Sequence, residues 1–111
     1  MAAVAFDPLS VSSEALRLAF ARSPSGMTIS AVDGRWLWVN DAYCRMLGYE
    51  SAELLRVSHR DVTHPDDVGG DNEFVADALA GQRESLEREK RYVHKDGSVV
   101  WAHVLAQVIR D

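Results

Sequence analysis

The feature that most constrains this chain is residues 91–101, where an Asp-Gly pair separates two runs of strand-forming residues. Asp96-Gly97 suits a type I′ turn, because glycine reaches positive φ without steric cost. The run that follows is β-branched and aliphatic, as in a strand. A second Asp-Gly pair, Asp33-Gly34, lies between two further apolar runs. The sequence therefore predicts one β-hairpin near each end of the chain.

The residues between the hairpins favour helices, and so does a segment before the first hairpin. The expected elements are a helix at 14–21, strands at 27–32 and 35–39, helices at 41–47, 51–55 and 72–79, and strands at 84–95 and 98–110. Residues 56–71 are expected to be irregular. Strands grouped at both ends of a chain predict an antiparallel sheet with helices on one side, which is an α+β fold.

Polar residues and glycines mark the ends of these helices. Asn40 or Asp41 is suited to cap the helix that continues through residue 47. Gly48 is expected to end that helix and Gly81 to end the next long one, because glycine adopts the left-handed conformation common at helix ends.

Length and charge restrict the class of protein. The chain has 111 residues, the length of one domain. Its formal net charge of −5 argues against nucleic acid as a partner. One cysteine excludes an internal disulfide and fits a reducing compartment. Residues 1–6 lack the basic start of a signal peptide, and no apolar run reaches transmembrane length. We therefore expect a cytoplasmic segment without membrane contact.

Short phrases over residues 20–111 resemble, in order and spacing, the PAS (Per-Arnt-Sim) sensory-box domain of bacterial signalling proteins. The matching phrases are Ser23-Pro-Ser-Gly-Met27, Asp33-Gly-Arg35, Val39-Asn40, Cys44-Arg-Met-Leu-Gly-Tyr49, Glu53-Leu54, His64-Pro-Asp-Asp67, Gly81, Glu89-Lys-Arg-Tyr92, Lys95-Asp-Gly97, Trp101 and Arg110-Asp111. The resemblance implies an antiparallel sheet of spatial order 2-1-5-4-3 with short helices on one face. Residues 1–22 are then a lead-in with an amphipathic helix, and residues 23–111 are the PAS domain.

The role implied by this resemblance is that of a regulatory sensor. Such a module binds a small molecule or a partner and transmits the signal to an attached output domain. The implied output is a histidine kinase or a cyclic-di-GMP enzyme outside this chain. The alternative is a purely structural PAS module that dimerises and binds no ligand.

The resemblance also implies a fifth strand that the chain does not contain. The sequence ends at Arg110-Asp111, where the family continues into that strand. We therefore expect a C-terminally truncated domain with a gap between its first and fourth strands. The gap can be filled by residues 1–8 of the same chain, by residues 1–8 of a neighbour, or by direct closure of the two strands. Exchange between chains is favoured, because it combines dimerisation with backbone pairing.

Alternation along the fourth strand identifies a candidate ligand pocket. Small residues at even positions face one side, and large ones such as Trp101 face the other. The small-residue face is expected to line a cavity under the helices, and the Trp101 face to pack under the N-terminal helix. The candidate lining residues are Val100, Ala102, Val104, Ala106, Tyr92, His59, Met46 and Phe74. In the alternative, the cavity is filled by Met27, Met46, Leu47, Phe74 and Leu79.

The helix at 14–21 suggests how the chain associates. Leu16 and Phe20 lie at i and i+4 and form an apolar stripe. We expect a homodimer in which these two residues are contacts. Packing of the same stripe on its own domain is the compatible alternative.

The sequence contains no catalytic constellation. It has no P-loop, no Gly-x-Ser-x-Gly and no His-Glu-x-x-His, so no enzyme activity is expected of this chain. The carboxylates of Asp66 and Asp67 are expected to cap the following turn rather than to act in catalysis or to bind a metal.

Some members of the family that this chain resembles bind haem or flavin, but the residues of this chain disfavour both cofactors. The histidines have no metal-site spacing, and the long helix at 72–80, where haem-binding relatives carry a ligand, contains none. Cys44 precedes Gly48, whereas the reactive cysteine of flavin-binding relatives follows that point; the matching position is near His59. Haem and covalent flavin are therefore not expected, and Cys44 is expected to be a small buried apolar residue. The identity of any ligand stays open.

Overall fold

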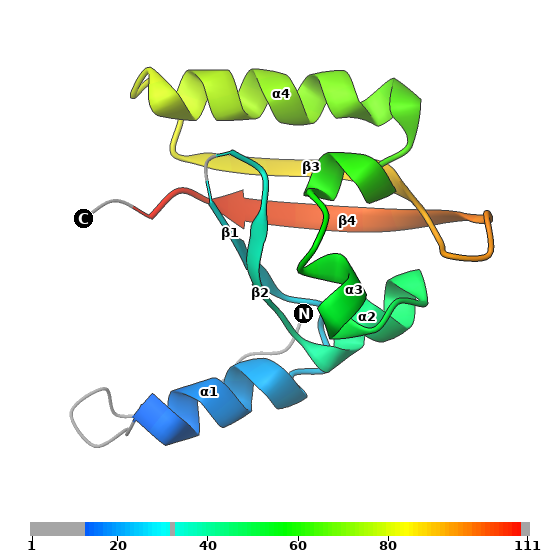
Figure 1. Cartoon of the computed structure of the whole chain (residues 1–111). Coiled ribbons are helices and arrows are strands. Elements are labelled where there is room, and N and C mark those ends of the chain that lie inside the picture. Colours follow the sequence, from blue (N-terminus) through cyan, green and yellow to red (C-terminus); the bar gives the residue numbers. More distant parts are fainter. Residues whose placement is uncertain (1–12, 32, 110–111) are drawn as a thin grey trace.

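Two antiparallel hairpins with a series of helices between them make up an α+β fold (Figure 1). The computed structural model describes residues 13–31 and 33–109. Strand β1 (Thr28–Ser30) pairs with β2 (Trp36–Val39), and β3 (Ser85–Val93) pairs with β4 (Val99–Gln107). Both hairpins predicted from the Asp-Gly pairs are therefore confirmed.

The two hairpins form separate sheets in the described part of the chain. One sheet has the order β1-β2 and the other β3-β4, and no ladder joins β1 to β4. Direct closure of the first strand against the fourth is therefore not observed. Residues 1–8, the other expected filler, lie outside the described residues. The exchange of a segment between chains stays a prediction.

Both hairpin turns differ from the predicted type in the same way. Gly34 and Gly97 have φ of 93° and 91°, and no other described residue besides Gly48 and Gly81 has positive φ. A type I′ turn needs two successive residues at positive φ, so that prediction is wrong. Each hairpin instead has a longer loop that ends in a left-handed glycine. In the first hairpin, the Ala31 N–H donates to the Arg35 carbonyl at 2.9 Å and the Gly34 N–H to the Ala31 carbonyl at 3.0 Å. In the second, the His94 N–H donates to the Ser98 carbonyl and the Gly97 N–H to the His94 carbonyl, both at 2.8 Å.

The described residues form five helical segments, of which the last four lie between the two hairpins. They are α1 (Ser13–Arg22), α2 (Asp41–Leu47), α3 (Ser51–Leu54), the 3₁₀ turn η1 (His59–Val62) and α4 (Pro65–Leu79). Gly48 ends α2 in the left-handed conformation, as predicted. Gly81 follows the last turn of α4 with a φ of 74°.

Helix α4 begins seven residues before its predicted start at 72, so residues 65–71 are helical rather than irregular. Pro65 occupies the first turn, where its missing N–H costs nothing. The Nδ1 atom of His64 accepts the N–H of Asp66 at 3.1 Å and caps the helix. Leu79, in the last turn of the helix, is 63% exposed. Polar capping at 64–66 therefore outweighs the low helix propensity of the Gly-Gly pair at 69–70.

Asn40 joins α1, the first hairpin and α2 through one buried amide. Its Oδ1 atom accepts the backbone N–H groups of Met27 and Tyr43 at 2.9 and 3.1 Å. Its Nδ2 atom donates to the carbonyls of Phe20 and Ser25, both at 2.9 Å. These four hydrogen bonds use both acceptor sites and both donors of the amide, and all of them go to backbone groups. The predicted N-cap is thus also the joint of the N-terminal half.

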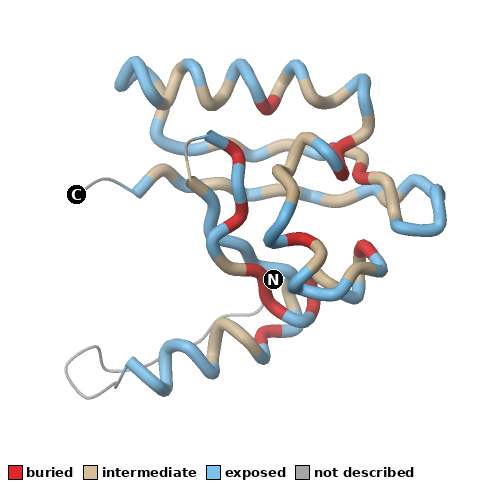
Figure 2. The backbone as a smooth tube through the Cα atoms, viewed as in Figure 1, coloured by how far each residue is buried: buried red, intermediate tan, exposed pale blue. Residues whose placement is uncertain are grey.

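The apolar core is built from β2, α2, α3, η1 and one residue of β3. Its buried residues are Trp36, Val39, Tyr43, Leu47, Leu54, Val62 and Tyr92. Helix α1 contributes no buried residue (Figure 2). Asp71 is the one buried residue of α4. The C-terminal hairpin and α4 are therefore held together in a different way from the rest.

The register of β4 follows the predicted alternation. Its even-numbered residues are half-buried and its odd-numbered residues are exposed. The predicted place of Trp101 under the N-terminal helix is wrong, because its side chain is 64% exposed. Helix α1 contacts α2 instead (Figure 1). The Phe20 ring lies against the Trp38 ring, with ring centroids 4.1 Å apart. Trp101 is stacked by the Arg91 guanidinium, 5.2 Å from its ring centre.

We expect Asn40→Ala to lower the free energy of unfolding by about 3 kcal/mol, because it removes a cap and leaves buried backbone groups unpaired. Urea denaturation should show a lower midpoint with an unchanged m-value. Asn72→Ala is the matched control: Asn72 is exposed and accepts one hydrogen bond, from Arg60 at 2.7 Å. Equal losses in both variants would contradict the role assigned to Asn40.

Candidate functional site

A buried carboxylate, that of Asp71, lies where α4, η1 and β3 meet. Asp71 is 7% exposed. Its Oδ2 atom lies 2.5 Å from the Lys90 Nζ atom and 3.5 Å from the His59 Nδ1 atom. Its Oδ1 atom lies 3.3 Å from an Nη atom of Arg88. One acidic group on α4 thus collects side chains from two other elements, η1 and β3.

Strand alternation and one glycine explain this cluster. Arg88, Lys90 and Tyr92 occupy alternate positions of β3 and therefore share the face toward α4. Gly70 lets the Arg88 guanidinium lie against the helix, since a Cβ atom there would be 1.8 Å from the Arg88 Nη1 atom. Gly70 thus weakens the helix locally but leaves room for the Arg88 guanidinium.

The charges of the cluster support one another. Burial opposes ionisation of Asp71, but the hydrogen bonds from His59 and Lys90 outweigh it, so the pKa of this carboxyl lies below its ordinary value. Burial lowers the pKa of Lys90 despite the carboxylate beside it. The Lys90 ammonium also lies 4.6 Å from the centre of the Tyr92 ring. The cluster is a charged group held away from bulk water.

Hydrogen-bond donors in this cluster outnumber acceptors. An ammonium has three donors, and the one hydrogen bond of Lys90 to a described residue goes to Asp71. Arg88 donates an Nη hydrogen to the carbonyl of Asp67 at 2.8 Å. Its Nε atom is buried and has no hydrogen-bond partner among the described residues. The cluster therefore has unmet donors on the covered side of β3.

A second ion pair fixes the start of α4 to the edge of β3. The Asp67 carboxylate accepts from the Arg91 backbone N–H at 2.6 Å and from its guanidinium at 2.9 and 3.1 Å. The hydrogen bonds from the guanidinium, and after them the one from the backbone N–H, hold the pKa of Asp67 well below its ordinary value. The His64 N–H donates to the Arg91 carbonyl at 2.9 Å. The carboxylate predicted to cap a turn is thus a clamp between helix and strand.

The structure brings some of the predicted pocket residues together. Tyr92 belongs to the core, and Met46, Val100, Ala102 and Val104 pack against it. Ala106 is half-buried toward the end of β4. His59 lies at Asp71, and Phe74 is on α4 beneath the Arg83 guanidinium at 5.6 Å. The sequence analysis missed Asp71, Arg88 and Lys90, although the alternation of Arg88, Lys90 and Tyr92 was a usable signal.

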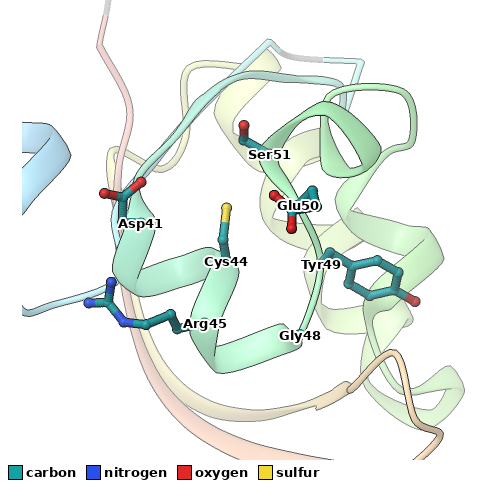
Figure 3. A pocket seen from close by; sticks show the side chains of 7 residues that line it. All are labelled: Asp41, Cys44, Arg45, Gly48, Tyr49, Glu50 and Ser51. Atoms are coloured by element: carbon teal, nitrogen blue, oxygen red, sulfur yellow. The ribbon is translucent and has the colours of Figure 1, made fainter.

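Two surface pockets lie away from these residues. One, of about 370 Å³, surrounds Cys44 between α2 and α3 (Figure 3). The other, of about 350 Å³, is lined by Tyr49, Glu53, Arg56, Val57, Asp61 and Val62. None of the eight predicted lining residues borders either pocket. Burial, with Asp41 and Glu50 nearby, raises the pKa of the Cys44 thiol, so the nucleophilic thiolate is disfavoured.

No group of three or more histidine, cysteine or acidic side chains in the described ranges is arranged to hold a metal ion. No helix within residues 13–31 and 33–109 has the length and apolar character needed to cross a membrane.

Comparison with known proteins gives a consistent result. The family described as PAS fold matches residues 36–111. A probable diguanylate cyclase, DgcE of Escherichia coli (strain K12), is 33% identical over 102 residues, which are 92% of this chain and 9% of that protein. The chain therefore spans a small part of this curated relative.

Solved structures show the same fold. A domain of a sensory box sensor histidine kinase/response regulator from Geobacter sulfurreducens has a TM-score of 0.76 at 25% identity and covers 87% of this chain and 83% of its own. A PAS domain from Colwellia psychrerythraea has a TM-score of 0.78 at 19% identity, covering 88% and 82%.

We expect Asp71→Asn to lower the free energy of unfolding by about 3 kcal/mol, because Lys90 would lose its buried counter-ion. The pKa of Asp71 is depressed in the folded state. Its contribution is therefore complete above a pH of about 4 and is lost as the pH falls toward the folded-state pKa. Urea titrations from pH 7 to pH 2 should show a weaker pH dependence in the variant than in the wild type.

Asp77→Asn is the control on the same helix, since Asp77 pairs with Arg83 at the surface at 3.6 Å. Its effect should be below about 1 kcal/mol. Similar stability and pH dependence of Asp71→Asn and wild type would show that the buried pair does not hold α4 in place.

Proposed function

Because the chain belongs to the PAS-fold family, we propose that it is a regulatory sensor module that binds a small molecule and passes the signal to an output domain. The observation that carries this proposal is the covered side of β4. Val100, Ala102, Val104 and Ala106 face inward there, but none of them is fully buried. The Arg88 Nε atom, buried without a partner among the described residues, is on the neighbouring strand. An apolar surface with a few polar groups beside it is typical of small-molecule sites.

The names of two relatives support the kind of output domain. One similar structure comes from a sensor histidine kinase/response regulator, and one similar sequence belongs to a probable diguanylate cyclase. We infer that this module regulates an output domain of one of these two classes and has no catalytic role itself. Both classes use nucleotides, which supports a position on the cytoplasmic side.

A second candidate function is dimerisation, with or without a ligand. No described residue of α1 is buried, and its apolar residues Leu16 and Leu18 are 46% and 39% exposed. Phe20 is engaged within its own chain by Trp38. Leu16 is therefore the better dimer contact of the two predicted residues. Residues 1–22 would then act as the dimerising lead-in to a sensor unit at 23–111.

We expect a thermal-shift screen of small metabolites to find a compound that raises the melting temperature of this chain by several degrees. A ligand at 100 times its Kd adds about 2.7 kcal/mol to stability by mass action. Ala102→Leu should reduce the shift, because it fills the proposed site without changing charge. Leu79→Ala, at an exposed position of α4, is the control. A screen without any stabilising compound would favour the ligand-free alternative.

For dimerisation, Leu16→Glu should shift sedimentation toward monomer, since a charge would have to be buried in the contact. Leu79→Glu introduces the same charge at another exposed helical leucine and should leave the profile unchanged. An identical dimer fraction in both variants, with folding verified by circular dichroism, would exclude α1 as the contact.

A further inference from the structure

The outer face of β4 is an exposed apolar row. Val99, Trp101 and Leu105 lie on this face, and each is at least half exposed, as is Ile109 just beyond the strand. The opposite face of β4 packs against the core. Apolar side chains gathered on one exposed face are typical of a surface that binds a partner. The described part of the chain leaves this row largely uncovered.

Acidic side chains border the row. Glu87 and Glu89 lie on the outer face of β3, and both are exposed. The Glu87 carboxylate lies 2.9 Å from the Nε2 atom of His103, whereas the Glu89 carboxylate has no partner among the described residues. Arg91, the cation on the same face, is already paired with Asp67. A partner for this surface should therefore present an apolar side chain with a basic one beside it.

Helix α1 presents this combination. Leu16 is exposed, and the turn of the helix places Arg17 on one flank of it and Arg22 on the other. Arg17 pairs with Glu14 at the surface at 3.1 Å, and Arg22 has no ion-pair partner in the part of the chain that the structure describes. The helix thus offers an apolar side chain between two cations, opposite in charge to the border of the β4 row.

The two surfaces do not meet within one molecule. The Asn40 Nδ2 atom donates to the Phe20 carbonyl at 2.9 Å, and the Phe20 ring lies against the Trp38 ring. These contacts fix α1 to the first hairpin, and α1 lies apart from the β3–β4 hairpin (Figure 1). Docking of α1 on the β4 strand of its own chain would require these contacts to break. Docking on a second copy leaves them intact.

From these observations, and resting on the proposed dimerisation, we propose that α1 of one copy of this chain docks on the outer face of β4 of a second copy. Leu16 would pack on Trp101 of the partner subunit and Leu105 of the partner subunit. Arg22 would lie near Glu89 of the partner subunit. Two-fold symmetry repeats the contact, so each copy contributes one helix and one strand face. Tryptophan at the centre of a contact is typical of the residues that dominate binding energy.

Disulfide crosslinking separates this contact from a contact between two α1 helices. Cys44→Ser removes the one cysteine of the chain and gives the background. A chain with Leu16→Cys is co-expressed with a differently tagged chain with Leu105→Cys and then oxidised. The mixed product should exceed both products between identical chains. Leu79→Cys, at an exposed position of α4, replaces Leu105→Cys in the control and should give little mixed product.

Charge reversal tests the polar border of the contact. By sedimentation equilibrium, Arg22→Glu and Glu89→Arg should each raise the dissociation constant of the dimer by about threefold, the effect of an exposed ion pair. The double variant should recover the wild-type constant, because it restores opposite charges across the contact. Leu105→Glu should shift the profile strongly toward monomer, and Leu79→Glu should leave it unchanged.

The outcomes separate this surface from dimerisation itself. A dominant product between two Leu16→Cys chains, or between two Leu105→Cys chains, would overturn the helix-on-strand contact and leave a dimer in place. A dimer weakened by Leu16→Glu but not by Leu105→Glu would do the same. A monomeric wild-type chain would overturn both proposals.

Discussion

Two ion pairs hold α4 on β3: the buried pair of Asp71 with Lys90, and the pair of Asp67 with Arg91 at the start of the helix. Burial of the Asp71 and Lys90 charges costs free energy, which their attraction and hydrogen bonds must offset. The pair therefore contributes orientation more than net stability. With Arg88 and His59 on the same carboxylate, a shift of α4 by one turn would leave several charged groups unpaired. Geometry of this kind fixes one register of the helix on the strand.

The same cluster touches the apolar core through Tyr92. The Lys90 ammonium lies 4.6 Å from the centre of the Tyr92 ring, and Tyr92 is one of the buried core residues. The Tyr92 ring in turn meets the Tyr43 ring edge-on, with ring centroids 5.8 Å apart. The charged contact of α4 and the apolar core around α2 therefore share one side chain, whereas Asn40 joins α1, the first hairpin and α2 through backbone groups alone.

Local chemistry made part of this fold predictable. Asp-Gly pairs located both hairpins, Asn40 was suited to cap α2, and alternation gave the register of β4. The turn type was mispredicted, because a longer loop that ends in glycine satisfies the same dipeptide. The start of α4 was predicted seven residues too late, since residues 56–71 were expected to be irregular. Within that stretch Gly70 leaves room for the Arg88 guanidinium, a contact 18 residues away that no local rule contains.

The charged cluster around Asp71 was not predicted either, because its members are far apart in the sequence. Sequence analysis identified small inward residues on β4, which depend on alternation alone. The cationic residues on β3 alternate equally well, but charged side chains are normally assigned to solvent unless a counter-ion is known. Asp71 becomes that counter-ion only once α4 is known to extend back past it. Alternating cations on a covered strand, opposite small residues, therefore predict a buried acidic partner elsewhere in the chain, and the search for that partner should precede the assignment of the helix boundary.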